Sequence, residues 1–423
     1  THLDGEVLTL SYMLAATRSH TTFRQAYSNM VNFPVSYTSY DRNTRERFTE
    51  HTFQIDYVRP FGKHHKIESG TKYILRNNNS TSLMDYQGTT PDMESKFKHN
   101  AQVAAAYLSY IFTAGKWAAR AGLRYEFTRM KASYPDGSNA DYHANLNDWV
   151  PSASLQYKIS DSQTLKFSYN TSINRPGIGY LNPAIISTPT AVSFGNANLG
   201  SSRNQKLQLV YMLVTSKLTL QLSPYYSFTN NGIGRILYEQ NRKDVSTYQN
   251  VLKNKVFGIS SYTEWTPFTG TSFTLNASMR YARITLPTPA IKNSGCGGDI
   301  YFNWEQKIPW ELTLTTSIGG EYGNSIYNPY AIAGHWFYYD FTLTRRFLKD
   351  KLTVSLSAES PFIKERSSTY RIVRGDYTGY ERAVMKPQRF EIGLSWSFGK
   401  LKASVKKAER SIQNDDLVGG GKK

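Results

Sequence analysis

The chain lacks several features that whole classes of proteins require. It has one cysteine, Cys296, which excludes a disulfide framework and a cysteine-based zinc site. Hydrophobic residues make up 39% of its 423 residues and its mean hydropathy is −0.50. It has no apolar run of the roughly 18 residues that begin to suggest a spanning helix, which excludes a helical membrane protein. We find no GxSxG, HExxH, Walker or EF-hand motif, and we expect no enzymatic activity, no cofactor and no metal.

Aromatic residues are abundant by contrast. They reach 14% of the chain, carried mainly by 31 Tyr and 21 Phe. Disordered chains are poor in such residues, so this chain is expected to fold despite its low hydrophobicity.

Apolar residues alternate with polar ones in many segments. Phe390, Ile392, Leu394 and Trp396 are separated by single polar or small residues, as are Leu352, Val354 and Leu356 in another stretch. Successive side chains of a strand point to opposite faces, so such segments have one apolar and one polar face. Helical spacing is scarce, and the pattern predicts an all-β protein.

Turn-forming residues between these segments divide the chain into sixteen predicted strands. We place them near 5–13, 50–59, 66–76, 100–112, 116–128, 148–158, 163–174, 204–214, 217–228, 248–265, 272–284, 296–307, 311–321, 336–347, 351–360 and 388–398.

The connections between these strands are alternately short and long. Short turns are expected around segments such as 60–63, and the long polar connections are 14–49, 77–99, 129–147, 175–203, 229–247, 285–295, 322–335 and 361–387. This regularity is typical of an antiparallel outer-membrane β-barrel, with short turns in the periplasm and long loops outside, and is not expected of a soluble sandwich. Both chain ends are then periplasmic. A sixteen-stranded lumen is too wide for side chains to fill, and must hold water, a plug or inward-folded loops.

The chain ends differ from the barrel region. Thr1 to Gly5 lead directly into the first strand with no signal peptide, so we expect residue 1 not to be the start of the gene product. After the barrel portion 1–398, residues 399–423 carry seven Lys/Arg and three Asp/Glu and end in Gly419-Gly420-Gly421-Lys422-Lys423. We expect this basic tail to be a mobile, solvated periplasmic extension with no partner.

The net charge of +18 has a membrane explanation. Arg and Lys at strand ends pair with anionic lipopolysaccharide, so lipid and lipopolysaccharide are the expected partners and nucleic acid is not. The last long loop contains four residues that combine charge with rings: Arg371, Arg374, Tyr377 and Tyr380. They suit an anionic or glycan ligand, but ordinary solvated loop charge explains them as well.

An ordered set of motifs resembles a known family. It comprises Ser168-Tyr169, Ile173-Asn174-Arg175-Pro176, Leu181-Asn182-Pro183 and Phe194-Gly195-Asn196-Ala197-Asn198-Leu199, with Ala121-Gly122-Leu123-Arg124-Tyr125-Glu126, Gly70-Thr71-Lys72-Tyr73, Ser397-Phe398-Gly399-Lys400 and Asn414-Asp415-Asp416. Together they resemble TonB-dependent receptors, and more narrowly the outer-membrane β-barrel branch of that family from Bacteroidota. The family's usual “NPNLKPE” is here Asn196-Ala197-Asn198-Leu199-Gly200-Ser201-Ser202, without its Pro, Lys and Glu.

The resemblance implies a barrel of twenty-two strands, an N-terminal plug and a TonB complex that pulls on the plug. Sixteen strands and no plug sequence are found here, so we expect the plug and the further strands to precede residue 1. The loop 174–200 would contact ligand or plug through Asn174, Arg175, Tyr180 and Asn182; simple packing of the loop is an equal alternative.

Three functions follow from these observations. The first is the barrel portion of a TonB-dependent receptor that imports a siderophore, glycan or peptide. The second is a porin-like passive channel. The third is a barrel scaffold in a larger outer-membrane assembly with surface lipoproteins or other partners. The transported substrate and the oligomeric state stay open.

Overall fold

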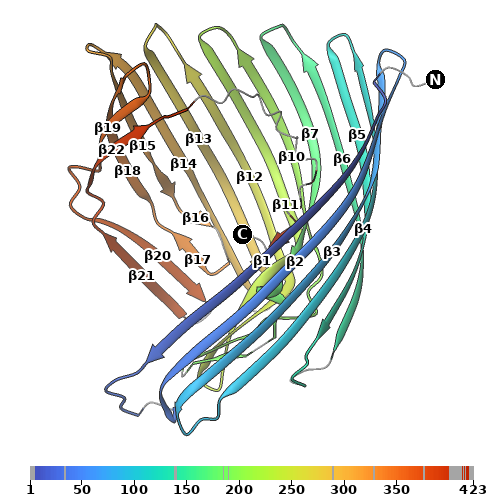
Figure 1. Ribbon diagram of the computed structural model, residues 1–423, viewed down its shortest axis with the longest axis vertical. Helices are drawn as coiled ribbons and strands as arrows, with labels where there is room; N and C mark the ends of the chain where they lie inside the picture. The colour runs from blue at the N-terminus through green and yellow to red at the C-terminus, as the bar shows by residue number, and fades with distance from the viewer. Residues whose placement is uncertain are drawn as a thin grey trace.

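The molecule is a curved sheet with a short hairpin sheet beside it (Figure 1). The computed structural model describes residues 5–32, 35–137, 141–183, 185–188, 190–287, 290–326, 329–374, 377–399, 412, 414 and 416–418. Within these residues the chain forms one 19-stranded sheet and one four-stranded sheet.

Sixteen strands of the large sheet are antiparallel neighbours in chain order. They are β1 (Val7–Ala26), β2 (Tyr37–Phe61), β3 (His65–Gly88), β4 (Met93–Ala114), β5 (Trp117–Ser133), β6 (Tyr142–Lys158), β7 (Gln163–Pro176), β10 (Ser202–Val214), β11 (Leu218–Gln240), β12 (Lys243–Trp265), β13 (Thr271–Leu286), β14 (Ile291–Ile308), β15 (Leu312–Gly323), β18 (Trp336–Phe347), β19 (Leu352–Glu359) and β22 (Arg389–Trp396). This confirms the predicted all-β antiparallel architecture and its chain order.

Many strands are longer than predicted. The first was expected over 5–13 but β1 continues to Ala26, and the expected loop 14–49 shrinks to the link between β1 and β2. The expected loop 77–99 is mostly strand as well, since β3 ends at Gly88 and β4 begins at Met93. Apolar alternation is needed only across a membrane band of about ten residues, whereas backbone pairing can continue beyond it through polar residues. The alternation therefore marks the lipid-facing part of each strand and not its end.

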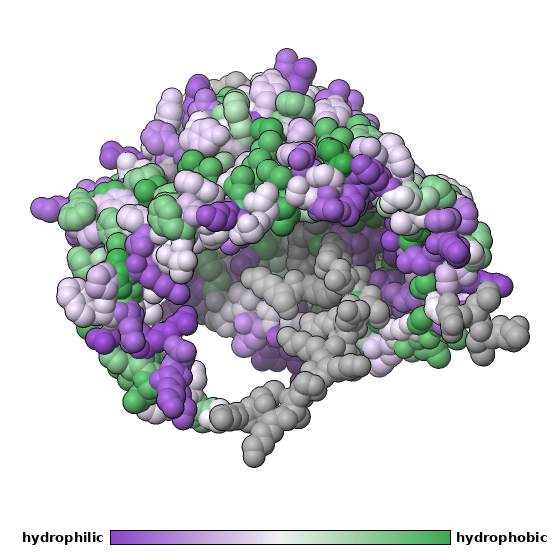
Figure 2. Space-filling view, turned by 90° about the horizontal axis from the view of Figure 1, so that it is seen from above, coloured by the Kyte–Doolittle hydropathy of each residue, from purple (hydrophilic) through white to green (hydrophobic). Residues whose placement is uncertain are grey.

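The two faces of the sheet differ in polarity. Leu10, Tyr12 and Leu14 of β1 are 71, 56 and 56% exposed on the outward face. Glu50 and Thr52 of β2 are fully buried on the opposite face. Seen from above, from the end with the short turns, the sheet curls around a hollow lined partly by hydrophilic residues (Figure 2). Apolar side chains outside and polar side chains inside are the arrangement that a membrane barrel requires.

Exposed tryptophans mark the edges of the apolar band. Trp117 opens β5 and Trp265 closes β12 at the end with the short turns, and each is 47% exposed. Trp149, 55% exposed, lies farther along β6, beside Tyr125 of β5. Indole rings favour the membrane–water boundary because they combine an apolar body with one N–H donor.

The structure has a single short α-helix, α1 (Ile178–Leu181), among its described residues. None of the described helical segments is long and apolar enough to cross a membrane.

The sheet of this chain is not a closed cylinder. Strands β1 and β22 are its two outer strands, and the described pairings join β1 only to β2 and β22 only to β19.

Two predicted loops form the small sheet instead. It consists of β16 (Ser325–Ile326), β17 (Ala331–Ala333), β20 (Arg366–Arg374) and β21 (Tyr377–Met385), all from the segments 322–335 and 361–387. Ile326 packs on Ala282 and Ile284 of β13, which holds this sheet against the large one.

The tail differs from the expectation where it is described. Ile412 and Asn414 are buried, and β23 (Leu417–Val418) pairs in parallel with Arg175 and Pro176 at the end of β7. These residues contact the inner face of the sheet, so they are neither solvated nor without a partner. The reason is a set of buried charges on that face, described below.

The two faces predict different responses to a charge in the membrane band. Ile259 of β12 is outward-facing and 43% exposed, and Ser260 points to the other face. We expect Ile259→Arg to destabilise the folded protein by about 2–4 kcal/mol because lipid cannot solvate the guanidinium, and Ser260→Arg to cost much less. Urea unfolding in liposomes measures the free energy of unfolding of each variant. Equal decreases in the two variants would contradict the assignment of faces.

Candidate ligand-binding site

A segment between β7 and β10 folds inward at the end of the sheet with the long connections. It contains α1, β8 (Ile186–Ser187) and β9 (Ala191–Ser193). Leu181 and Leu199 are each 1% exposed and pack with Phe97 of β4. Burial of these leucines fixes the segment against the wall formed by β4 and β5. We call residues 177–200 the mouth loop.

The mouth loop is also bonded to β12. The Phe194 N–H donates to the Ser246 carbonyl at 3.1 Å, and the Asn196 Nδ2 donates to the Tyr248 carbonyl at 2.8 Å. The rings of Tyr180 and Tyr248 stack at 4.3 Å between centroids. The loop therefore spans from the β4–β5 wall to the β12 wall, and it confirms that this barrel holds an inward-folded loop.

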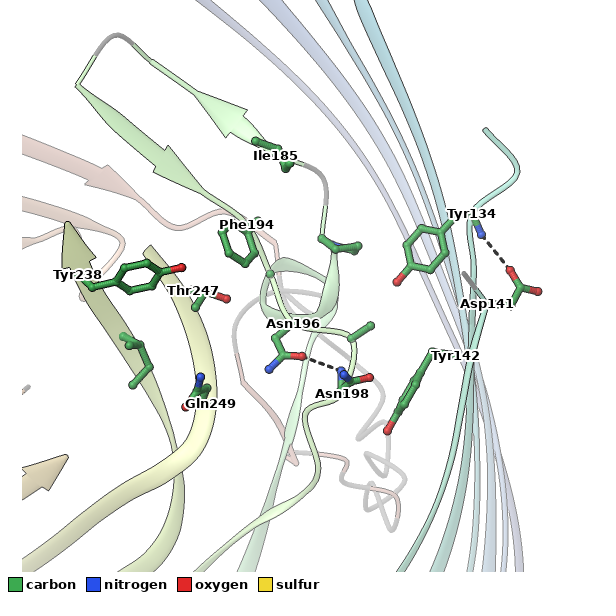
Figure 3. Close-up of a pocket in the computed structure, with 14 residues that line it drawn as sticks. Tyr134, Asp141, Tyr142, Ile185, Phe194, Asn196, Asn198, Tyr238, Thr247 and Gln249 are labelled. Carbon is green, nitrogen blue, oxygen red and sulfur yellow. Dashed lines mark hydrogen bonds between the residues drawn. The ribbon is translucent and has the colours of Figure 1, made fainter. Parts of the chain in front are cut away.

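A cavity of about 970 Å³ lies between the mouth loop and these walls (Figure 3). In Figure 3, Tyr134 and Tyr142 lie on one side, Tyr238 and Thr247 on the other, and the loop between them. The cavity is lined by Tyr134, Asp141, Tyr142, Pro183, Ile185, Phe194, Gly195, Asn196, Ala197, Asn198, Ile236, Tyr238, Thr247 and Gln249.

The lining combines aromatic rings with amides and hydroxyls. Tyr142, Phe194 and Tyr238 supply flat apolar faces, and Gln249 and Thr247 supply hydrogen-bonding groups. Such a lining suits a ligand that has cyclic faces and polar edges. The volume is that of a small-molecule site, for which about 300–1,000 Å³ is typical.

The hydrogen bonds of the lining hold its shape. The Asn196 Oδ1 accepts from the Asn198 N–H at 2.9 Å, while its Nδ2 is held by Tyr248. The Tyr134 N–H donates to the Asp141 Oδ1 at 3.3 Å. Burial first, and the nearby Asp141 charge second, raise the pKa of the Tyr134 phenol. Tyr134 therefore stays protonated and can donate a hydrogen bond to a ligand.

None of the four residues predicted in the segment 174–200 lines the cavity. Asn174 pairs with Ser202 at the start of β10. Tyr180 stacks on Tyr248, and the Asn182 carbonyl accepts from the Gly195 N–H at 2.8 Å. The fourth, Arg175, is 3% exposed and bonded into a charge cluster on the inner wall.

The other four predicted residues belong to the small sheet. Arg371 faces Tyr380 across the β20–β21 hairpin, and Tyr380 is 71% exposed. Arg374 and Tyr377 form the last pair before the turn, and their side chains lie outside the described part of the structure. The structure thus places the two predicted groups on different sheets.

Sequence reasoning missed most of the lining. Tyr134 and Tyr142 flank the polar turn at Pro135–Gly137, and Tyr238 and Gln249 lie on the extended β11–β12 hairpin. The available signal was the presence of tyrosines within two of the predicted long connections, 129–147 and 229–247. That signal is weak, because 31 tyrosines occur in the chain.

Gly195 gives a direct test of the loop packing. A Cβ there would lie 2.4 Å from the Asn182 carbonyl oxygen and 2.7 Å from that of Tyr180, whereas at Gly200 the nearest atom would be 3.7 Å away. We expect Gly195→Ala to displace the mouth loop and speed its proteolysis severalfold, and Gly200→Ala to leave it unchanged. Limited proteolysis of both variants in detergent checks this; equal cleavage would contradict the packing.

Comparison with solved structures finds the same fold in proteins of low sequence identity. The ferric yersiniabactin uptake receptor FyuA from Yersinia pestis matches with a TM-score of 0.62 at 14% identity, over 94% of this chain and 60% of that one. The siderophore receptor PiuA from Acinetobacter baumannii matches with a TM-score of 0.64 at 13% identity, over 93% and 62%. The copper transporter OprC matches with a TM-score of 0.65 at 11% identity, over 92% and 62%.

The chain thus spans about 60% of the length of these receptors and transporters, and the likeness shows a shared barrel fold. A comparison with curated proteins found no match. The family model described as “Outer membrane protein beta-barrel family” matches residues 2–396. With sixteen antiparallel strands and an apolar outer face, the chain belongs to the outer membrane protein beta-barrel family.

Proposed function

We propose that this chain is the barrel portion of a TonB-dependent outer-membrane receptor that imports a nutrient bound at the mouth loop. The observation that carries the proposal is the cavity of about 970 Å³ between the mouth loop and the walls, at the end with the long connections. A ligand held there lies between the mouth loop and the walls (Figure 3).

The finer features of the proposal come from the motif resemblance and the fold likeness. The long connections face outward and both chain ends are periplasmic. A plug and further strands outside this chain complete the barrel between β1 and β22 and couple it to TonB. The motif pattern favours the Bacteroidota branch. Within the described residues, the outer edges of β1 and β22 have no strand partner. This supports the proposal that further strands complete the barrel, because a strand edge in lipid leaves backbone groups without hydrogen bonds.

The lining limits the class of nutrient. Rings at Tyr142, Phe194 and Tyr238 favour ligands with cyclic faces, and the amide of Gln249 favours ligands with several hydrogen-bonding groups. Ferric siderophores, oligosaccharides and short peptides meet both conditions. The solved relatives include receptors for siderophores and a copper transporter, which supports a siderophore as the first candidate.

Ligand binding to the purified chain in detergent tests the proposal. Titration with a ferric catecholate siderophore, a ferric hydroxamate siderophore, maltoheptaose and a tripeptide should give saturable binding of one class. We expect Tyr142→Ala and Phe194→Ala each to weaken that binding roughly tenfold, since each removes a buried ring contact. Phe268→Ala is the matched control, because Phe268 is 66% exposed in a short turn far from the cavity. Binding that none of these variants changes would contradict the site.

The hollow interior also suits a passive channel, the second candidate. Planar-bilayer recording separates the two functions when it uses the complete gene product. A receptor stays closed because its lumen is occupied, whereas a passive channel conducts steadily. Steady conductance without ligand would therefore favour the channel.

A further inference from the structure

The inner wall of the sheet carries a cluster of buried charges that the mouth cavity does not use. Glu50 of β2 and Arg76 of β3 are direct cross-strand partners, 2.6 Å apart, with side chains 0 and 2% exposed. Arg175, at the end of β7, pairs with Glu126 of β5, and its side chain is 4% exposed. Arg76 and Arg175 thus approach the same region of the wall from different strands.

Two guanidinium groups are buried in this wall, and each lies beside one carboxylate of the wall. Arg76 contacts Glu50 and Arg175 contacts Glu126, with the arginine side chains 2 and 4% exposed. Glu126 is shared, because Arg124 also contacts it at 2.5 Å. Buried charges are costly unless they are paired, so a further anion beside Arg76 and Arg175 is favourable.

The anion is supplied by the C-terminal segment. The Asp416 carboxylate accepts two hydrogen bonds from the Arg76 guanidinium, at 2.7 and 2.8 Å, and one from Arg175 at 2.7 Å. Burial alone would raise the pKa of Asp416, but the hydrogen bonds and charge of the two arginines hold it well below the usual range. The carboxylate is therefore ionised at neutral pH, and its paired hydrogen bonds to the Arg76 guanidinium are geometrically specific.

A second side chain and the backbone complete the contact. The Asn414 Nδ2 donates to the Glu50 Oε1 at 2.9 Å and to the Thr52 Oγ1 at 2.8 Å. The Arg175 N–H donates to the Asp416 carbonyl at 2.5 Å, where β23 begins to pair with β7. Asn414 and Asp416 are two residues apart in the sequence, and both side chains contact the wall. Backbone pairing supplies affinity in such a contact and the alternate side chains supply specificity.

The same contact is small enough to be reversible. It consists of one amide side chain, one carboxylate side chain and a short parallel bridge. Release of the segment would return Arg76 and Arg175 to a lumen in which another carboxylate can bind them.

We propose that the inner wall of β2–β7 is a recognition site for acidic peptide segments of the pattern Asn-x-Asp, and that the C-terminal segment with Asn414 and Asp416 is its tethered, exchangeable occupant. Glu50 and Thr52 bind the Asn414 amide, and Arg76 and Arg175 bind the Asp416 carboxylate. The tail then neutralises the wall until a segment of the same pattern replaces it. This site is separate from the mouth cavity, so the inference holds whether the protein is a receptor or a passive channel.

Cross-linking in the full chain tests whether the tail docks. In a Cys296→Ser background, Thr52→Cys with Asn414→Cys should form a disulfide on mild oxidation, because the two native side chains are 2.8 Å apart. Ser109→Cys with Asn414→Cys is the matched control. Ser109 is a buried residue of β4 that pairs with Glu68, several residues nearer the short turns than the strand pairs at Thr52. Mass spectrometry should find the first disulfide and not the second; equal yields, or none in either, would overturn the proposal.

Peptide exchange tests what the site recognises. A fluorescent peptide with the sequence of residues 410–420 is titrated against the full chain in detergent. We expect it to bind the Asp416→Asn chain at least tenfold more tightly than the unaltered chain, whose own tail competes. A peptide with Asp416→Asn should bind at least tenfold more weakly than the native-sequence peptide. Equal binding of the two peptides to the Asp416→Asn chain would overturn the proposal.

Variants of the wall complete the test. Arg175→Lys keeps the charge but loses the paired N–H donors, and should weaken the peptide severalfold; Arg175→Gln should weaken it further. Because Arg175 is buried, each variant is first checked for heat-modifiable migration on a gel, which reports a folded barrel. Folded Arg175→Gln protein that binds the peptide unchanged would also overturn the assignment. The ligands of the mouth cavity should bind all of these variants equally, which separates this inference from the proposed function.

Discussion

The satisfaction of backbone hydrogen bonds in a medium without water determines the rest of this structure. A strand in hydrocarbon can pair its N–H and C=O groups only with its neighbours, so strands that cross a membrane form a continuous sheet. Among the described residues, fourteen of the sixteen long strands pair on both sides, and β1 and β22 pair on one side. The same requirement makes the outward side chains apolar and leaves the inward ones free to be polar, which explains how a chain with 39% hydrophobic residues can be a membrane protein.

Polar residues on the inner face have two different surroundings. Near the short turns they line the hollow, and farther along the strands they are buried by the chain's own segments. The mouth loop covers Phe97 of β4, and the C-terminal segment covers Arg76 and Glu50. Each segment contributes a short strand that adds hydrogen bonds to the wall. β9 of the mouth loop pairs in parallel with β12, and β23 pairs in parallel with β7. The interior is thus organised by backbone pairing and by buried ion pairs.

Several strands and turns could be predicted from particular residues. The alternation of Phe390, Ile392 and Leu394 identified β22, and the turn at Pro60–Lys63 separated β2 from β3 at the expected place. Arg175 was singled out by a motif, but its burial against Asp416 was not expected. A polar residue at an inward position has the same sequence pattern whether it meets water, an ion pair or a docked segment. Only its neighbours in space distinguish these cases.

The sequence by itself determined the fold class and the chain order of the sixteen long strands. These properties depend on period and on turn residues, which are local and can be read from a few neighbouring positions. The tertiary structure alone decided that the mouth loop folds inward, that the small sheet forms from two connections, and that Asp416 meets Arg76. The last two residues are 340 positions apart, and no local pattern encodes a contact at that separation.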